Sequence, residues 1–118
     1  MKKHVYVIED DPDIGELISF LLAERGYEVA VFGNIASFRK QEEARPSLLI
    51  IDVMLPDGNG LDICKAWKTN PDTQDIPVLV MSAYEDSRSD ERARYAEGFI
   101  SKPFDIQSFL KDVTDRLK

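Results

Sequence analysis

An unbroken apolar run at residues 48–51 ends directly on the carboxylate of Asp52, and a loop rich in proline, aspartate, glycine and asparagine follows. A continuous apolar segment bounded by turn residues is typical of a strand buried on both faces of a parallel sheet. Asp52 would then lie at the carboxyl end of that strand, where open α/β sheets bind their ligands. The chain therefore has to supply helices for both faces of a sheet and partners for one isolated carboxylate.

Strand-like segments alternate with amphipathic helical segments along the chain. We expect strands at residues 5–8, 27–32, 48–52, 76–81 and 99–101. We expect helices from Pro12, after an Asp N-cap, to Gly26, from Asn34 to about Glu43, from Leu61 to just before Asn70, within 84–97, and from Asp105 onwards. Right-handed crossovers then give a doubly wound α/β fold, a five-stranded parallel sheet of order 2-1-3-4-5 with five helices.

The segment at residues 84–97, YEDSRSDERARYAE, has only a weak helical pattern. Charged residues occupy most of its positions, and only Tyr84, Ala93, Tyr95 and Ala96 are suited to a core. Two parallel strands nevertheless need a crossover connection at this point. We therefore predict a short or atypical fourth helix that is loosely docked or partly mobile.

Length, charge and cysteine usage restrict the possible classes of function. Residues 1–118 are enough for one domain with a hydrophobic core. No apolar run approaches the ~20 residues that span a membrane, and no signal peptide precedes the first strand, so we expect a cytoplasmic protein without membrane contact. The net charge of −7 argues against direct nucleic-acid binding, which depends on Lys and Arg. The single Cys64 excludes an internal disulfide and is interpreted as a buried thiol.

Polar side chains follow four of the five predicted strands at one edge of the sheet. They are Glu9 and Asp10, Asp52, Ser82, and Lys102. Three carboxylates in one crevice repel each other, so a cation has to compensate them. Mg²⁺ prefers oxygen ligands and commonly bridges carboxylates to a phosphate. With a metal, an ammonium and a hydroxyl around it, Asp52 is equipped to act as a nucleophile that forms an aspartyl phosphate.

The motifs VIEDDPDI, IIDVMLPDGNG, Ser82-Ala83 and SKPF, in this order, resemble the response-regulator receiver domain of two-component signalling. The resemblance covers essentially the whole chain and implies the flavodoxin/CheY-like fold. It implies that Asp52 accepts a phosphoryl group from a histidine kinase or a histidine phosphotransfer protein. It also implies Mg²⁺ (or Mn²⁺) bound by Asp10, Asp52 and the backbone carbonyl of Met54, and by Glu9 through a water.

The same resemblance assigns roles to the other strand ends. Ser82 and Lys102 would contact the phosphoryl oxygens, Lys102-Pro103 would be a cis peptide, and Phe99 would be an aromatic switch that turns inward as Ser82 moves. The domain would act as a phosphorylation-dependent switch with intrinsic self-phosphorylation, not as an enzyme on a metabolite. Its surface around the fourth helix, fifth strand and fifth helix would regulate an effector domain or a downstream protein.

The chain departs from the family pattern before the fifth strand. Receiver domains usually carry a Gly-Ala-Asp-like segment a few residues before the switch aromatic, whereas here Gly98 directly precedes Phe99. The shortened segment falls on the fourth helix and its junction with the fifth strand. In the family this face dimerises or binds partners.

Met54 and Tyr84 occupy positions that bear on the lifetime of an acyl phosphate. They lie two residues after Asp52 and Ser82, on either side of the expected line of attack. Neither a thioether nor a bulky ring orients a hydrolytic water as Asn or an acid does. We therefore expect slow autodephosphorylation.

Three other functions compete with the receiver assignment. A Mg²⁺-dependent phosphatase of the haloacid-dehalogenase type would carry a second Asp at position 54, where this chain has Met54, and a cap domain for which 118 residues leave no room. A flavodoxin-like cofactor binder would cradle a phosphate in its first loop, where Glu9, Asp10 and Asp11 repel it. A degenerate receiver that serves only for docking is disfavoured by the complete set of site residues.

Overall fold

The computed structural model describes residues 3–41 and 45–117, which are organised around a five-stranded parallel sheet of order β2-β1-β3-β6-β7. Every pair of neighbouring strands in this sheet is parallel. The strands are β1 (His4–Ile8), β2 (Glu28–Phe32), β3 (Leu48–Asp52), β6 (Val78–Ser82) and β7 (Gly98–Ser101). The predicted sheet and its order are confirmed, with β6 and β7 as the fourth and fifth strands.

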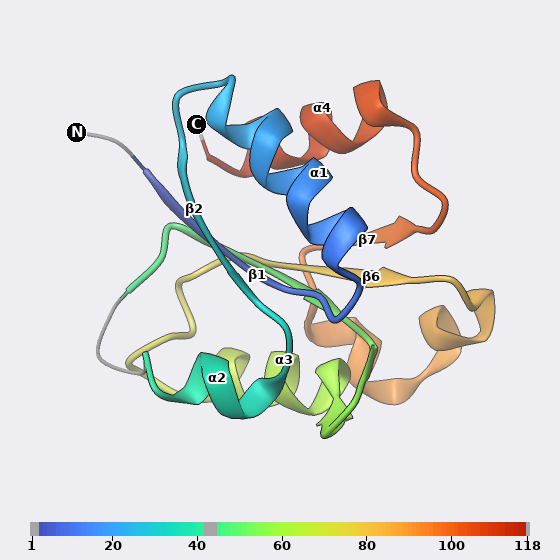
Figure 1. Cartoon of the computed structure of the whole chain (residues 1–118). Coiled ribbons are helices and arrows are strands. Elements are labelled where there is room, and N and C mark those ends of the chain that lie inside the picture. The colour runs from blue at the N-terminus through green and yellow to red at the C-terminus, as the bar shows by residue number, and fades with distance from the viewer. Residues whose placement is uncertain (1–2, 42–44, 118) are drawn as a thin grey trace.

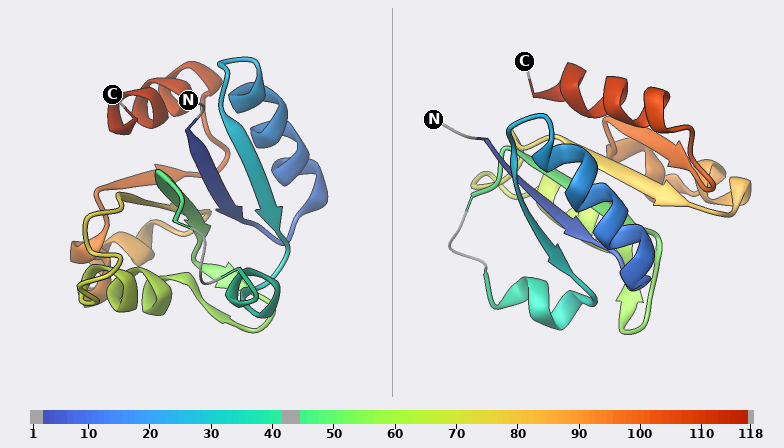
Figure 2. Two further views of the ribbon diagram at one scale, coloured as in Figure 1. Left: turned by 90° about the vertical axis from the view of Figure 1, so that its left-hand side faces the viewer. Right: turned by 45° about the horizontal axis from the view of Figure 1, so that its top comes forward.

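Helices cover both faces of the sheet, as Figures 1 and 2 show. One face carries α1 (Pro12–Ala23) and α4 (Ile106–Arg116), and the other carries α2 (Ile35–Arg39) and α3 (Gly60–Lys68). Successive side chains of a strand point to opposite faces, so Val5 and Val7 of β1 join the core under α1 and α4 while Tyr6 and Ile8 join the other. Within residues 3–41 and 45–117, no helix is both long enough and apolar enough to cross a membrane.

The central strand β3 lies between β1 and β6 and is covered on both faces. Leu48, Leu49, Ile50 and Ile51 are each 0% exposed. Burying a side chain of this size contributes about 1.5–3 kcal/mol, so a polar residue within this run would be strongly unfavourable. The apolar run therefore ends only where the strand reaches the edge of the sheet, at Asp52.

The first acidic segment contains a helix cap as well as site residues. Oδ1 of Asp11 accepts hydrogen bonds from the backbone N–H groups of Asp13 (2.9 Å) and Ile14 (3.4 Å), and Pro12 occupies the first turn of α1. Gly26, with φ 87°, follows the helix in a left-handed conformation. The predicted N-cap is confirmed, and Asp11 has a structural role that separates it from Glu9 and Asp10.

Helix α2 is shorter than predicted. It begins after Asn34, whose side chain accepts a 2.7 Å bond from Ser37 N, and it ends at Arg39. Its apolar residues Ile35 and Phe38 are buried, whereas residues 39–41 are exposed, so no buried face favours another turn. The predicted end at Glu43 lies outside the described residues.

The predicted short or atypical fourth helix is confirmed as atypical, because no α-helix forms between β6 and β7. Two 3₁₀ helices, η1 (Glu85–Ser89) and η2 (Glu91–Tyr95), take its place, and none of their residues is fully buried. A segment with so few apolar residues gains little from a regular helix face, and 3₁₀ turns suit short pieces. Side-chain bonds hold η2 instead, because Arg92 Nη1 lies 2.7 Å from Asp62 Oδ1 on α3. The described chain thus contains four α-helices.

Cys64 lies on α3 and is fully buried, as predicted. Burial raises the pKa of its thiol to about 11, and the nearby carboxylate of Glu97 adds to the shift. The thiol is therefore protonated at neutral pH, as expected for a structural cysteine.

The loop after β3 is a small hairpin that returns the chain to the end of β3. Strands β4 (Met54–Leu55) and β5 (Gly58–Asn59) pair antiparallel, and Gly60 N donates a 2.8 Å bond to Val53 O. A Cβ on Gly60 would lie 2.1 Å from the carbonyl oxygen of Asp52. Only glycine allows α3 to start this close to the backbone of Asp52.

We expect Gly60→Ala to lower the free energy of unfolding by about 3 kcal/mol, because the backbone at Asp52 or α3 must shift. Gly33→Ala is the matched control, since no atom lies within 4 Å of its Cβ position. It should change stability by less than about 1 kcal/mol. Urea unfolding of the two variants checks this, and equal stability would contradict the close approach.

Candidate phosphoacceptor site

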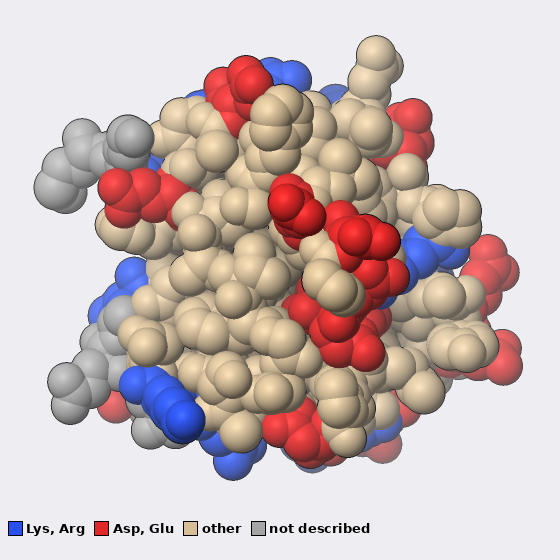
Figure 3. All heavy atoms as spheres, viewed as in Figure 1, with Lys and Arg blue, Asp and Glu red and all other residues tan. Residues whose placement is uncertain are grey.

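Four strands deliver polar side chains to one edge of the sheet. Asp52 and Ser82 are the last residues of β3 and β6, while Glu9 and Lys102 directly follow β1 and β7. The parallel register aligns these ends, with Asp52 opposite Met81 and Ser82 opposite Ser101. Figure 3 shows acidic side chains gathered where Figure 1 places the end of β1 and the start of α1.

Burial distinguishes this edge from the rest of the described chain. In residues 3–41 and 45–117, the buried polar or charged residues are Glu9 (2% exposed), Asp52 (6%) and Ser82 (3%). A buried polar group is costly unless it is bonded, and a buried charge is more so. Sequence reasoning predicted all three as site residues, and the structure brings their strand ends together.

Lys102 compensates two of the buried carboxylates. Its ammonium Nζ contacts Glu9 Oε1 and lies 3.1 Å from Asp52 Oδ2. The Glu9 and Asp52 side chains are 0% and 8% exposed and that of Lys102 is 14% exposed, so solvent screens this cluster weakly. The Lys102-Pro103 peptide is cis, as the family resemblance implied.

The shared ammonium shifts proton affinities in the cluster. Burial raises the pKa of Glu9, and the negative charge of Asp52 adds to this, while the bonds from Lys102 and from Asp11 N only partly oppose it. Burial acts to lower the pKa of Lys102, but its bonds to Glu9 and Asp52 outweigh burial and the net shift is upward. Both shifts favour the protonated form, for Glu9 because its carboxylate is buried and for Lys102 because its ammonium bonds two carboxylates.

Asp10 completes an acidic group that fits a divalent cation. Carboxylate oxygens of Glu9, Asp10 and Asp52 all lie within 4.8 Å of one another. Three carboxylates and one ammonium, that of Lys102, leave a net charge of about −2 at this edge. All the ligands are hard oxygens, which Mg²⁺ prefers, and the exposed Asp10 leaves room for water.

Ser82 is at the site edge, but its hydroxyl faces the segment that follows β6. Ser82 Oγ accepts a bond from Tyr84 N at 3.0 Å and lies 3.1 Å from Tyr84 O and 3.0 Å from Ser87 Oγ. Its hydrogen-bonding capacity is therefore used by residues 84–87 in this structure.

Phe99 is half-buried in β7, on the face of the sheet covered by α3 and η2. The guanidinium of Arg88 lies 4.6 Å from the centre of its ring. The sequence analysis predicted Phe99 as the switch aromatic but did not predict that Arg88 would contact Phe99 or that Ser87 would contact Ser82. The charged segment 84–97 carries no periodic pattern that would have placed them, and their positions depend on the 3₁₀ turn of η1.

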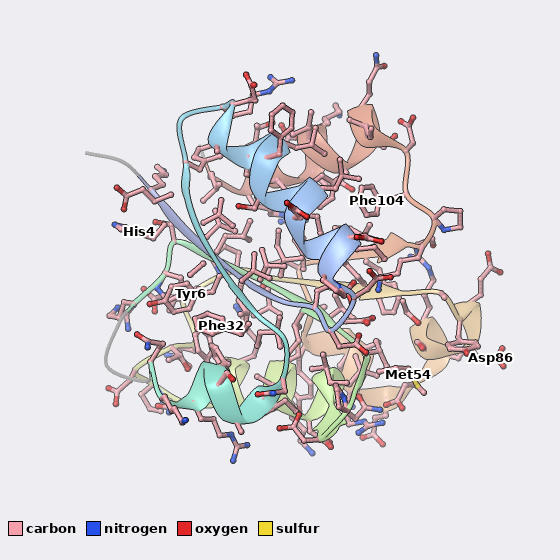
Figure 4. All side chains as sticks on the ribbon, in the orientation of Figure 1. His4, Tyr6, Phe32, Met54, Asp86 and Phe104 are labelled. Carbon is pink, nitrogen blue, oxygen red and sulfur yellow. The ribbon has the colours of Figure 1, made fainter. Side chains whose placement is uncertain are left out.

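Met54 and Tyr84 both have accessible side chains near the site. They are 60% and 61% exposed. Figure 4 shows Met54 on the side of the molecule where the strands reach their carboxyl ends. Both side chains are therefore open to solvent.

Comparison with known proteins identifies the family to which this chain belongs. The family model of the response regulator receiver domain matches residues 5–114. The chain belongs to the response regulator receiver family. Its fold is that of a receiver domain of two-component systems.

Curated relatives include both long and short response regulators. The DNA-binding response regulator MtrA of Mycolicibacterium smegmatis is 27% identical over an alignment of 121 positions, which covers 100% of this chain and 52% of that protein. RpaA of Synechocystis, a DNA-binding dual master transcriptional regulator, is 32% identical over 97% of this chain and 48% of its own length. The polar-differentiation response regulator DivK of Brucella anthropi is 29% identical over 99% of this chain and 98% of its length. The receiver chain thus spans about half the length of MtrA and RpaA.

Solved receiver structures superimpose over nearly the whole chain. The response regulator TrrA of Thermotoga maritima, in complex with Mg²⁺-BeF, has a TM-score of 0.88 at 27% identity and covers 99% of this chain and 100% of its own. The BeF₃-activated DrrB receiver domain has a TM-score of 0.84 at 30% identity, with coverages of 99% and 98%. These relatives show that the backbone described above is the receiver fold.

We expect Lys102→Met to lower the free energy of unfolding by about 3 kcal/mol, because it leaves Glu9 and Asp52 buried without their cation. Lys68→Met is the comparison, since Lys68 is as buried but pairs with one carboxylate, Glu97, that is 27% exposed. It should lose only about 1 kcal/mol.

The double variant Glu9→Gln/Lys102→Met separates charge repulsion from lost packing. It should be more stable than Lys102→Met alone, because it also removes one of the two unpaired charges. Thermal or urea unfolding measures all the variants. Strictly additive losses would contradict the shared-ammonium arrangement.

Proposed function

We propose that this receiver domain, residues 1–118, is a phosphorylation-dependent switch in which Asp52 accepts a phosphoryl group. The donor is the phosphohistidine of a sensor histidine kinase or a histidine phosphotransfer protein. The main support for this proposal is that the buried polar side chains lie together at one edge of the sheet. The buried polar residues of the described chain, Glu9, Asp52 and Ser82, all belong to the edge of the sheet where Lys102 supplies the cation.

The transfer uses Asp52 as the nucleophile. One of its carboxylate oxygens forms a bond to phosphorus while the bond from phosphorus to the donor nitrogen breaks, and the electron pair returns to that nitrogen. Lys102, already 3.1 Å from Asp52 Oδ2, stabilises the negative charge of the phosphoryl oxygens. Ser82 donates its hydroxyl hydrogen to another of these oxygens. The product is an acyl phosphate on Asp52.

The acidic group would hold the divalent metal ion that assists this transfer. Asp10, Asp52 and the backbone carbonyl of Met54 are the proposed direct ligands, with Glu9 acting through a water. A bound Mg²⁺, or Mn²⁺ in its place, would neutralise the charge between carboxylates and phosphoryl oxygens. The net charge of about −2 at this edge favours a divalent ion.

The phosphorylated form passes its signal through a surface and acts on no metabolite. We place this surface on η1, η2, β7 and α4, which take the positions of the family's fourth helix, fifth strand and fifth helix. It would regulate an effector domain or a downstream protein in the cytoplasm, where histidine kinases present their phosphohistidine. The net charge of −7 favours a protein partner over direct contact with nucleic acid, which the names of MtrA and RpaA assign to those longer proteins.

We expect incubation with Mg²⁺ and acetyl phosphate to add one phosphoryl group to the wild-type protein. Asp52→Asn should stay unmodified, because an amide oxygen is a poor nucleophile. Asp11→Asn should be labelled like the wild type, since Asn caps α1 as well as Asp does. Intact-mass spectrometry distinguishes the three proteins. An unlabelled wild type, or equal labelling of Asp52→Asn, would refute the proposal.

Met54→Asn should accelerate loss of the phosphoryl group by about tenfold, below the ~10²-fold effect of a full general base. An amide at this exposed position can orient a hydrolytic water, whereas the thioether cannot. Phe20→Asn, another change of an exposed apolar residue (61% exposed) but on α1, is the control and should leave the rate unchanged. Phosphate release from the labelled protein measures the rate. Slower release from Met54→Asn would show that Met54 does not limit hydrolysis.

A further inference from the structure

The hydroxyl of Ser82 is fully engaged in this structure. A serine hydroxyl has one hydrogen to donate and two lone pairs to accept with. Tyr84 N donates to Ser82 Oγ at 3.0 Å, and the remaining contacts are to Tyr84 O at 3.1 Å and Ser87 Oγ at 3.0 Å. Ser82 cannot donate its hydrogen to a phosphoryl oxygen while that hydrogen is shared with Tyr84 O or Ser87.

The residue after Ser87 binds the predicted aromatic switch. Nη2 of Arg88 donates to Ser101 Oγ at 3.0 Å and to the carbonyl oxygen of Phe99 at 3.3 Å, and its guanidinium lies 4.6 Å from the centre of the Phe99 ring. A guanidinium over an aromatic face is attractive and restrains the ring beneath it. Ser87 therefore contacts Ser82, and Arg88, the next residue of η1, contacts Phe99.

We propose that Ser87 and Arg88 form a latch that holds the unphosphorylated state. Ser87 is a positioning residue that keeps the Ser82 hydroxyl turned away from Asp52, and Arg88 keeps Phe99 in its half-buried position. This inference rests on the proposed function, because it concerns how the same site is regulated.

The position of η1 makes it suited to release. None of its residues is fully buried, and Glu85 and Asp86 are exposed. Figure 4 shows Asp86 at the outer edge of the molecule, on the side where the strands reach their carboxyl ends. A short exposed turn loses little apolar contact when it moves, so the polar bonds of the latch account for much of its attachment to the sheet.

Phosphorylation opens the latch through Ser82. When the Ser82 hydroxyl rotates toward a phosphoryl oxygen, its Oγ leaves the position in which it bonds Tyr84 O and Ser87 Oγ, so η1 is held less firmly. Because Arg88 is the next residue in the same turn, its contacts with Phe99 and Ser101 weaken as η1 shifts. Only interactions that differ between the two states move the equilibrium, and these contacts belong to the unphosphorylated state.

Beryllofluoride with Mg²⁺ tests this directly, because a relative's receiver domain is activated by it. Ser87→Ala should bind beryllofluoride between about twofold and about tenfold more tightly than the wild type, the range for loss of one neutral hydrogen bond from the resting state. Ser89→Ala is the matched control, since it makes the same change in an exposed residue of the same turn. It should bind like the wild type. NMR titration of ¹⁵N-labelled protein gives the affinities.

The amide signals of Phe99 and Ser101 report whether the two contacts are linked. In beryllofluoride-free protein, Ser87→Ala and Arg88→Gln should each move these signals toward their positions in the beryllofluoride-bound wild type. Arg94→Gln, which removes the same charge from η2, should not. Ser87→Ala that binds no more tightly than Ser89→Ala, or binds more tightly without moving Phe99, would overturn the latch. A wild type that binds no beryllofluoride at all would overturn the proposed function instead.

Discussion

One ammonium, that of the half-buried Lys102, lies between two buried carboxylates that the sheet brings together. Parallel strands end at the same edge, so Glu9 after β1 and Asp52 at the end of β3 approach each other before any ligand is present. The two carboxylates repel each other, and the bonds from Lys102 to Glu9 and Asp52 offset this repulsion and the cost of burying the charges. The rest of the domain holds these three groups in place.

Lys102 compensates the negative charge of the carboxylates only in part, so the site can still respond to a cation and a phosphoryl group. With Asp10 included, three carboxylates face one ammonium, and the raised pKa of Glu9 reflects burial that Lys102 does not fully offset. A divalent cation would bring two positive charges, and phosphorylation would change the charge of Asp52 from −1 to about −2. Lys102 could then exchange a carboxylate partner for a phosphoryl oxygen. The arrangement in which Lys102 bonds Glu9 and Asp52 is thus one of two that the same side chains support.

The sequence was informative where local patterns and strand topology decide the structure. The apolar run before Asp52 predicted a doubly buried strand, and the common edge of parallel strands predicted that Glu9, Ser82 and Lys102 would join it. The sequence was uninformative where contacts between residues far apart in the chain determine the local structure. Helix η2 is held by the pairing of Arg92 with Asp62, thirty residues away. The start of α2 is capped by Asp57, whose carboxylate accepts hydrogen bonds from two backbone N–H groups more than twenty residues away in the chain.

The central claim is that Asp52, Lys102 and Ser82 together bind a phosphoryl group. A crystal structure of the protein with Mg²⁺ and beryllofluoride tests it most directly. We expect beryllium bound to the Asp52 carboxylate, Lys102 Nζ in contact with a fluoride, and the Ser82 hydroxyl turned from Ser87 toward another fluoride. Beryllofluoride bound elsewhere, or bound at Asp52 while Lys102 and Ser82 keep their present partners, would contradict it.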